Sequence, residues 1–335
     1  MSDVAREAGV SLVTVSRVIN TPEQVAPATR AAVQAVVARL GYVPNLTAGS
    51  LATSRSRIVA AIVPTIANLV FSETIEALTQ TLAEGGHQLL VGQSGYRAAD
   101  EAALVETFLG RRVDGLVLTG CHQPPALRVR LRQAELPVVQ TWDLPEPGGA
   151  PVLDMAVGFS NVAAGAAAAG HLLGRGHRLL GFLGADEDRS RLRLQGFQAA
   201  AAAQGAEVLT ALLRPPATMA QAAQRLVEMV TRQPALSAVF CNNDLLATAV
   251  LFECLRQGWD VPRRLAILGF GDLPVAELAV PPLSTVRVRR GEIGTRAGQL
   301  LLARLGHGGD AATGALAATA SRVDIGFELV VRGST

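Results

Sequence analysis

The segment "SLVTVSRVIN", residues 11–20, carries side chains that suit the recognition of DNA bases. Three apolar residues at positions i, i+3 and i+4, counted from Val15, repeat with the period of a helix and mark its inner side. Leu12, Val13 and Arg17 then lie on the outer side. Arginine can donate two hydrogen bonds to guanine, and aliphatic side chains can contact the methyl group of thymine. The spacing therefore predicts a helix whose outer side fits the major groove of DNA.

The residues around this segment predict how it is held. Gly9 can adopt a positive φ and end a preceding short helix, and Ser11 is a good N-cap for the next one. Two short helices joined by such a turn are typical of a helix-turn-helix, in which hydroxyl groups such as those of Thr14 and Ser16 contact phosphates. The same pattern also fits an ordinary helical hairpin that packs into a larger domain.

A third helix is predicted for "PATRAAVQAVVARL", with Pro27 at its first position and Gly41 just past its end. Three helices around one small core form a minimal DNA-binding headpiece. The stretch that follows, residues 45–57, contains threonine, glycine and serine, which lower helix propensity and indicate a linker. The expected apolar face of the third helix consists of Ala31, Val33, Val36, Val37 and Leu40.

The composition excludes several kinds of enzyme. All 30 basic residues are arginine, so the chain offers neither the lysine of a P-loop nor a lysine for a Schiff base. The sequence contains no Gly-x-Ser-x-Gly elbow, no Gly-x-Gly-x-x-Gly loop and no metal-ligand spacing of histidines. We therefore expect no catalytic residues, no metal and no cofactor.

The charge of the N-terminal segment and the search for export and membrane segments indicate which partners and which cellular location to expect. Residues 1–57 carry six Arg against three Asp or Glu, an excess that suits DNA phosphates but is too small to exclude chance. Such a weakly charged headpiece favours action as a pair. No apolar run reaches the length of a membrane span, no export leader precedes the first helix and the three cysteines show no pairing pattern. We expect a cytoplasmic, nucleoid-associated bacterial protein with no membrane partner.

After Arg57, short apolar runs alternate with helical patterns in two successive series, which predicts two α/β lobes with parallel sheets. Ligands of such sheets bind beyond the carboxyl ends of the strands, where Asn, Asp, Ser and Arg gather in this chain. Polar loop ends are common in any protein, so this pattern alone is weak evidence. The expected strands are residues 58–64, 87–93, 113–120, 137–142, 177–184, 206–213, 237–242 and 265–271. The expected helices are residues 72–85, 101–111, 162–175, 222–233 and 244–257.

Segments spread over the whole chain resemble the LacI/GalR family of bacterial transcription regulators. The resemblance implies a small all-α helix-turn-helix headpiece at 1–44, a hinge at 45–57 and a two-lobed α/β domain of the periplasmic-binding-protein type at 58–335. Within the family, three segments are most similar to the gluconate-repressor branch: "VPTIANLVFSE", "SGYRAADE" and "VLDMAVGFSN". The segments that carry the wider resemblance are "DVAREAGVSLVTVSRVIN", "VDGLVLTG", "RGHRLLGFLG", "VFCNNDLLATAVL", "LAILGFGD", "PPLSTVR" and "ELVVRGST".

The resemblance implies a repressor that binds a double-stranded DNA operator as a homodimer, with a tetramer as a further option. Leu51 of the hinge would insert into the minor groove at the centre of the operator. The implied DNA-binding residues are Ser11, Leu12, Val13, Thr14, Ser16, Arg17, Asn20, Asn45, Ala48 and Leu51.

The resemblance also implies a small effector between the two lobes. The segment "RLRLQGF" matches the family's Arg-x-x-Gly-aromatic motif and places Arg193 at the basic position that contacts sugars, with a surface salt bridge as the alternative. Asn243 matches an effector residue but also fits a helix cap. Asp143 fits an effector-binding role and a purely structural role equally, because the spacing around it differs from that of the sugar-binding members. The helix expected after residue 159 could bind an anion through its first amides. The implied effector-binding residues are Asn68, Phe71, Tyr96, Asp143, Ser160, Asn161, Arg193, Asn243 and Gly271.

Departures from the family pattern favour a particular ligand. Gly271 stands where many sugar-binding relatives have a carboxylate, and the loss of an acidic group from a pocket that keeps Arg193 favours an acidic ligand. We therefore expect a small sugar acid, such as gluconate or a keto or epimeric relative. Ala26 replaces the usual capping serine, and Gly49 replaces a common hinge arginine. The glycine would remove one contact with the DNA backbone. The chain also starts close to the first helix, where the family usually has several more residues, and a late start or a trimmed N-terminus would weaken DNA binding.

Three alternatives to this function stay open. The first is an exported receptor for a sugar, which should carry a signal peptide and lack the helix-turn-helix. The second is a regulator of the same family that senses a different ligand. The third is an α/β enzyme, which the fold alone does not exclude. The sequence also leaves open whether the effector releases the DNA or strengthens DNA binding.

Overall fold

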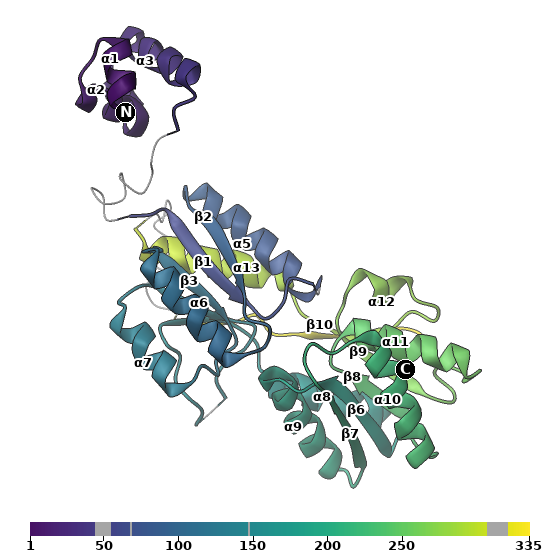
Figure 1. Cartoon of the computed structure of the whole chain (residues 1–335). Helices are drawn as coiled ribbons and strands as arrows, with labels where there is room; N and C mark the ends of the chain where they lie inside the picture. Colours follow the sequence, from purple (N-terminus) through teal and green to yellow (C-terminus); the bar gives the residue numbers. More distant parts are fainter. Residues whose placement is uncertain (44–54, 68, 147, 307–320) are drawn as a thin grey trace. The chain divides into compact units, whose positions relative to one another are not determined.

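The computed structural model divides the chain into two compact units, Met1–Ser56 and Arg57–Thr335 (Figure 1). We refer to them as the headpiece and the large unit. The hinge predicted at 45–57 lies mostly outside the described residues and stays a prediction. The structure describes residues 1–43, 55–67, 69–146, 148–306 and 321–335.

In its described residues the headpiece has three short helices and one 3-10 turn. Gly9 ends the first helix with a φ of 64°, a left-handed conformation that glycine adopts without strain. Ser11 caps the second helix, because its hydroxyl accepts a hydrogen bond from the backbone N–H of Thr14 at 3.1 Å. The elements are α1 (Ser2–Ala8), α2 (Leu12–Asn20), η1 (Pro22–Gln24) and α3 (Pro27–Leu40).

The headpiece core is small and aliphatic. Val15 and Val18 are buried as the periodicity predicts, and so are Val33 and Val36 of α3. The predicted apolar face of α3 is wrong at two positions, Ala31 and Leu40, which are exposed. Ala31 lies two positions before Val33 and therefore on another side of the helix. Leu40 is the last residue of α3, the longest of the three helices.

The large unit contains two six-stranded sheets, which define two lobes. In the first sheet all neighbouring strands are parallel, in the order β11-β5-β4-β3-β1-β2. These strands are β1 (Ile58–Val63), β2 (Gln88–Gln93), β3 (Gly115–Thr119), β4 (Val138–Thr141), β5 (Met155–Gly158) and β11 (Arg322–Asp324).

The second sheet has the order β12-β10-β9-β8-β6-β7, in which β12 runs antiparallel to β10 and the other neighbours are parallel. The predicted fold class, a helical headpiece with a two-lobed and mainly parallel α/β domain, is confirmed. The strands of this sheet are β6 (Leu179–Ala185), β7 (Glu207–Leu213), β8 (Ala238–Cys241), β9 (Ala266–Gly271), β10 (Ser284–Arg287) and β12 (Glu328–Val330).

Helices cover both faces of each sheet, as the alternation of buried residues requires. Val59 and Ala61 of β1 pack in the same cluster as α5 and α13, whereas Ala60 and Ile62 pack with α6 and α7. In the second lobe α8 and α9 cover one face, and α10 and α11 cover the other. The helices are α5 (Ser72–Glu84), α6 (Ala98–Gly110), α7 (Pro125–Gln133), α8 (Asn161–Gly174), α9 (Asp188–Ala202), α10 (Met219–Arg232), α11 (Asp244–Arg256), α12 (Pro274–Leu278) and α13 (Arg290–Arg304), with a short 3-10 turn η2 (Leu69–Phe71). In the part of the chain that the structure describes, no helix is long and apolar enough to cross a membrane.

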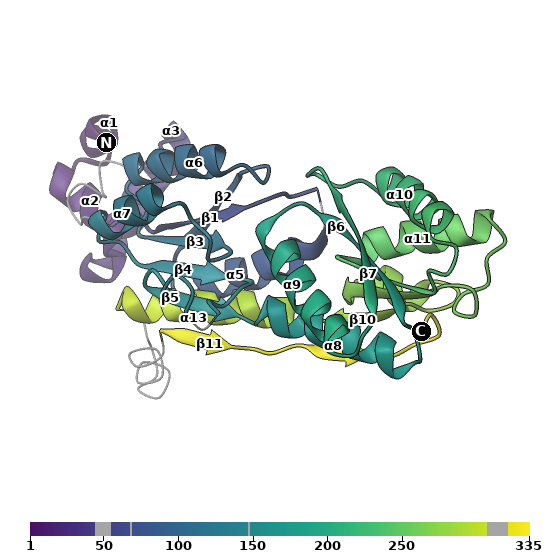
Figure 2. The ribbon, with the colours of Figure 1, turned by 90° about the horizontal axis from the view of Figure 1, so that it is seen from below.

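The two lobes are not two consecutive stretches of chain. Helix α13 packs against α5, β4 and β5, and β11 pairs with β5, so the chain returns to the first lobe after building most of the second. Figure 2 shows the segment after β11 leaving the first lobe for the second, where the chain ends. We call residues 57–158 and 290–325 lobe 1, and residues 160–288 and 328–335 lobe 2. The sequence predicted the alternation of strands and helices but not this exchange.

Candidate functional site

The outer side of α2 is exposed as the periodicity predicts. Leu12 and Val13 have 49% and 59% of their surface exposed, and Arg17 is also exposed. The hydroxyl groups of Ser11 and Thr14 lie 2.9 Å apart in a hydrogen bond at the start of the helix. We call Leu12, Val13 and Arg17 the recognition face, because these three side chains combine one guanidinium with two aliphatic groups on an accessible helix.

The other predicted DNA-binding residues are described only in part. Ser16 is half-buried on α2. Nothing is described of the side chain of Asn20, and Asn45, Ala48 and Leu51 lie outside the described residues. Helix α3 begins at Pro27 after Ala26, which provides no side-chain cap. The predicted contacts of these residues with DNA stay predictions.

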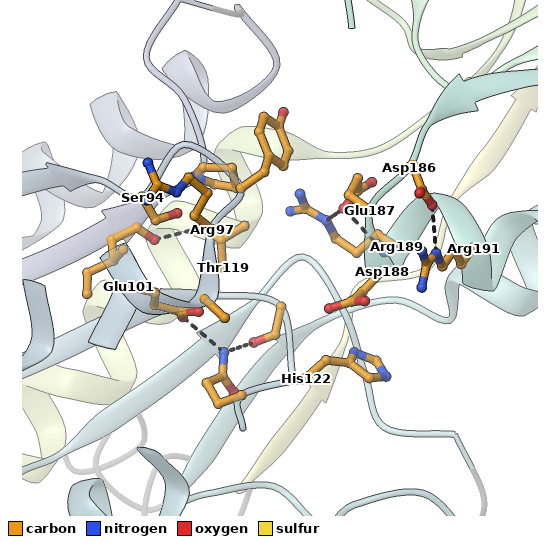
Figure 3. A pocket seen from close by; sticks show the side chains of 16 residues that line it. Ser94, Arg97, Glu101, Thr119, His122, Asp186, Glu187, Asp188, Arg189 and Arg191 are labelled. Carbon is orange, nitrogen blue, oxygen red and sulfur yellow. Dashed lines mark hydrogen bonds and ion pairs between the residues drawn. The ribbon is translucent and has the colours of Figure 1, made fainter. Parts of the chain in front are cut away.

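The second candidate site lies between the lobes of the large unit, where two adjoining hollows share Tyr96, Glu187 and Arg189. Including space open to solvent, the inner hollow measures about 400 Å³ and the outer hollow about 960 Å³. Figure 3 shows the outer hollow, with Glu101 and His122 of lobe 1 opposite the start of α9 in lobe 2. The inner hollow is lined by Val70, Phe71, Tyr96, Trp142, Glu187, Arg189, Arg193, Asn242, Asn243 and Phe270.

Arg193 makes three side-chain hydrogen bonds in the inner hollow. Its Nε donates to Asn242 Oδ1 at 2.8 Å and its Nη1 donates to Asn161 Oδ1 at 2.6 Å, while its Nη2 also bonds to Asn242. The guanidinium lies 4.2 Å from the centre of the Phe270 ring, a cation–π contact. Arg193 is 5% exposed, and this burial lowers the pKa of its guanidinium to about 10. These bonds fix the plane of the guanidinium before any ligand binds.

Arg189 lies one turn before Arg193 on α9 and is buried to a similar degree, at 7% exposed. Its Nε donates to Glu187 Oε2 at 3.2 Å, and its guanidinium lies 5.3 Å from the ring centre of Phe71 in lobe 1. Burial works to raise the pKa of Glu187, but Arg189 and Arg193 together hold it below its usual range. Two guanidinium groups therefore share one close carboxylate.

Asp143 joins this cluster from lobe 1. It is fully buried, accepts a hydrogen bond from Asn161 Nδ2 at 2.9 Å and lies 3.3 Å from His122 Nδ1 through its second oxygen. The hydrogen bond to Asp143 raises the pKa of His122, although the burial of the ring opposes it. A polar chain from His122 through Asp143 and Asn161 to Arg193 thus passes from lobe 1 to lobe 2.

Aromatic rings form the apolar walls of the inner hollow. Phe71 and Trp142 of lobe 1 meet edge to face with ring centres 5.0 Å apart, and Phe270 faces them from lobe 2. Lobe 1 therefore supplies mostly apolar surface, whereas lobe 2 supplies the guanidinium and amide groups. This arrangement suits a small polar ligand that carries a negative charge.

Comparisons with known proteins identify the family. Residues 1–45 match the family model of bacterial regulatory proteins of the lacI family, and residues 169–335 match a periplasmic binding protein-like domain. The whole chain is 38% identical to the HTH-type transcriptional regulator GntR of Pseudomonas aeruginosa, of which 95% is covered. The chain belongs to the lacI family of bacterial regulatory proteins. Its predicted class, a DNA-binding transcription regulator rather than an enzyme, is confirmed.

Further relatives support the assignment of this LacI-family regulator over its full length. It is 32% identical to GntR of Escherichia coli, with all of this chain and 98% of that protein covered. A solved LacI-family protein from Silicibacter pomeroyi has a TM-score of 0.89 at 31% identity, covering 99% of this chain and 98% of that one. The solved GntR from Chromobacterium violaceum has a TM-score of 0.75 at 38% identity over 83% of this chain and 98% of that one.

The structure brings five of the predicted effector residues of this LacI-family regulator to the inner hollow or its immediate support. Phe71, Tyr96, Arg193 and Asn243 line the hollow, and Asn161 bonds to Arg193. Asn243 also caps α11, because its Oδ1 accepts the N–H of Leu246 at 2.9 Å. Asp143 lies one step further, behind Asn161. Asn68 lies outside the described residues.

Two predicted positions have other roles. Ser160 caps α8 by accepting the N–H of Ala163 and donates to Glu146 at 2.6 Å, so a carboxylate already lies at the helix start where an anion was expected. Gly271 is absent from the described lining of both hollows and has a φ of 120°. A side chain is strained in that conformation, so the glycine is explained by the backbone rather than by the ligand. Asp272, the next residue, is paired with Arg287 and Arg332.

Asp244 supports the site from behind. It is fully buried, accepts hydrogen bonds from Leu273 N and from Thr285 Oγ1, both at 2.6 Å, and burial raises its pKa to about 6. It thereby joins the start of α11 to the strands β9 and β10. We propose that Asp244 supports the site through these contacts.

Four residues of the site were not predicted from the sequence: His122, Glu187, Arg189 and Asn242. Arg189 had a usable signal, because residues four apart on a helix lie on one face and Arg189 is four positions before Arg193. Asn242 is adjacent to Asn243 in "CNND", and only the structure distinguishes the residue that bonds Arg193 from the one that caps α11. No sequence pattern indicated His122, which meets Asp143 only through the fold.

Proposed function

We propose that this LacI-family regulator represses transcription from a DNA operator under the control of a small sugar acid, gluconate or a close relative, that binds between its lobes. The observation that carries the proposal is the pair of buried guanidinium groups, Arg189 and Arg193, which share the carboxylate of Glu187, while the buried Asp143 reaches Arg193 only through Asn161. A buried charge requires a compensating partner. A ligand carboxylate would supply it.

Further support comes from the polar groups near these arginines and from the resemblance to the gluconate-repressor branch. Asn243 and Tyr96 line the same hollow and provide amide and phenol groups that suit the hydroxyls of a sugar acid. Gly271 gives no support, since its backbone conformation explains it. A regulator of this family with a different acidic ligand would use the same arginines and differ in the groups around them.

At the DNA we propose that α2 enters the major groove, with Arg17 bonded to a guanine and with Leu12 and Val13 against thymine methyl groups. The hydroxyls of Thr14 and Ser16 would contact phosphates. Contacts from Ser11, Asn20, Asn45, Ala48 and Leu51, including insertion of Leu51 into the minor groove, remain part of this proposal. Operator binding would place the protein in the bacterial nucleoid.

We also propose a homodimer, with a tetramer as a further possibility. Four large apolar residues on and near α11 and α12 are more than half exposed, which is unusual for a surface without a partner. Two headpieces would also double the modest positive charge that one provides. Sedimentation at micromolar concentration should show a dimer, and a monomer would contradict the proposal. The exposed residues are Phe252, Leu255, Leu278 and Val280.

Calorimetry with gluconate, 2-ketogluconate and glucose tests the effector class. A charge-assisted hydrogen bond contributes about 1.5–3 kcal/mol, so the acid should bind at least tenfold more tightly than the neutral sugar. Equal affinities would contradict the sugar-acid effector and leave the assignment as a transcription regulator unaffected. Gel-shift assays with and without the acid, on an operator selected from random DNA, then show whether the acid releases the operator or strengthens binding.

A further inference from the structure

We propose that Arg189, and not Arg193, is the residue that binds the carboxylate of the effector, while Arg193 is a positioning residue that orders the amides of the inner hollow. This inference rests on the proposed sugar-acid function and assigns the charge recognition within it. It follows from how the donors of the two guanidinium groups are used.

The donors of Arg193 are already directed at protein acceptors. Nε and Nη2 share Asn242 Oδ1, Nη1 bonds to Asn161, and Nη2 also lies 3.7 Å from Glu187 Oε1. All three nitrogens therefore face groups of lobe 2. A carboxylate that bound to this guanidinium in the same plane would have to displace one of the two amides, each of which is itself buried.

The donors of Arg189 are used differently. Its Nε bonds to Glu187, but its Nη1 is buried without a hydrogen-bond partner among the described residues. Leaving a buried donor without an acceptor is costly, and the cost is larger for a charged group. Because the side chain is 7% exposed and lines both hollows, an acceptor for Nη1 can come from a ligand that occupies them. A carboxylate is the acceptor that suits a guanidinium best.

The position of Arg189 also connects charge recognition to the lobes. The residue belongs to α9 of lobe 2, yet its guanidinium lies over Phe71 of lobe 1. Figure 3 shows it reaching across the cleft toward the side that carries Ser94 and Arg97. An acid bound to Nη1 therefore contacts a guanidinium group that belongs to lobe 2 and packs against lobe 1. Such a ligand should favour the arrangement of the lobes seen here more strongly than a neutral sugar does.

The test compares gluconate with gluconamide, which has the same hydroxyl chain and no charge. Isothermal calorimetry measures both ligands on the wild type, on Arg189→Gln and on Arg193→Gln. The double variant Glu187→Gln/Arg189→Gln removes both charges of the pair, so no buried carboxylate is left without its partner. Arg225→Gln, an exposed arginine of α10 paired with Glu228, is the control for the general loss of one positive charge. Circular dichroism and thermal unfolding confirm that each variant is folded.

We expect the wild type to prefer the acid at least tenfold, a difference of about 1.4 kcal/mol, and both Arg189 variants to bind acid and amide within about threefold of each other. Arg193→Gln should weaken both ligands by a similar factor and keep the preference. The inference is wrong if the folded Arg189 variants keep the wild-type preference or if Arg193→Gln alone abolishes it. A wild type that shows no preference for the acid contradicts the sugar-acid function itself, and the inference with it.

Discussion

The headpiece and the cleft between the lobes place their contact residues in opposite surroundings. The recognition face of the headpiece is exposed, with Val13 at 59%, and the buried core beneath it is entirely aliphatic. In the cleft, by contrast, Arg189 and Arg193 are nearly buried and Asp143 is fully buried. Asn161 connects two of them, because it donates a hydrogen bond to Asp143 and accepts one from Arg193. The residues proposed to contact DNA are therefore not part of the core that stabilises the headpiece. The polar residues of the cleft, in contrast, both form the proposed effector site and stabilise the fold.

This difference predicts how each region tolerates change. Exposed side chains usually alter stability by less than about 0.5 kcal/mol when truncated, whereas removing one member of a buried polar cluster leaves its partners without bonds. Substitutions on the recognition face should change binding alone. Substitutions in the cleft should change stability and binding together.

The largest effect is expected for Arg193→Ala. The substitution leaves the amide oxygens of Asn161 and Asn242 without a donor, and the free energy of unfolding should fall by about 3–5 kcal/mol. Urea unfolding measures it. Arg191→Ala is the matched control, because Arg191 lies on the same helix in an exposed pair with Asp186 and its loss should change stability far less. Equal losses of unfolding free energy for the two variants would contradict the expectation that buried residues of the cleft contribute more to stability than exposed residues.

A smaller loss is expected for Thr285→Val, which keeps the shape of the side chain and removes the hydroxyl that bonds Asp244. At pH 7 the free energy of unfolding should fall by about 1–3 kcal/mol, because an ionised buried carboxylate loses a donor. Because the pKa of Asp244 is raised to about 6, this carboxyl becomes neutral below that pH and needs the donor less. The loss should therefore be smaller at pH 5 than at pH 7, and a loss independent of pH would argue against this role of Asp244.

On the recognition face, Arg17→Ala should leave stability unchanged within about 0.5 kcal/mol. The cost should appear in DNA binding instead, as about 1–3 kcal/mol lost at a single guanine of each half-site. Selection from random DNA compares the base preferences of wild type and variant. An unchanged preference would show that Arg17 does not read a base, and a loss of stability would show that the recognition face is not independent of the fold.

The smallest effect is expected from His122, whose side chain is 46% exposed. Its pKa is raised in the folded protein by the hydrogen bond to Asp143, so its contribution to stability is fully present below the unfolded value of about 6.5 and is lost as pH rises through the folded value. The melting temperature of the wild type should thus exceed that of His122→Gln, and this difference should be larger at pH 5.5 than at pH 8.5. Because His122 itself is half exposed, the difference in unfolding free energy should stay below about 1 kcal/mol. A larger advantage at the higher pH would contradict the predicted sign.

The sequence was most informative where periodicity alone decides the outcome. The inner side of α2 and the main helices of both lobes follow from the 3.6-residue period, and the main strands follow from short apolar runs. Both are local properties of the chain. The elements α7, α9 and α13 were not predicted, and neither were β5, β10, β11 and β12. Short strands and helices rich in arginine carry weak periodic signals, and the return of α13 to lobe 1 depends on packing between distant segments.

The candidate site shows the same limit at the level of single residues. Arg193 was predicted through a motif, and spacing along α9 would have added Arg189. The alternative role considered for Asn243, a helix cap, is present together with its place in the hollow. Gly271 was interpreted as a missing carboxylate because a sequence does not reveal a φ of 120°. Which donors are already bonded is a property of the assembled lobes and needed the structure.

The return of the chain to lobe 1 has a consequence for the order in which the protein is made. A ribosome completes the headpiece first and most of lobe 1 soon after, but α13 and β11 emerge only near the end of translation. Until then the apolar face of α5 and the edge of β5 lack their partners. The sheet of lobe 2 is complete only after β12, which follows α13 and β11 in the chain, has been synthesised. The nascent regulator therefore carries the three helices of the headpiece before either lobe of the large unit has all its strands.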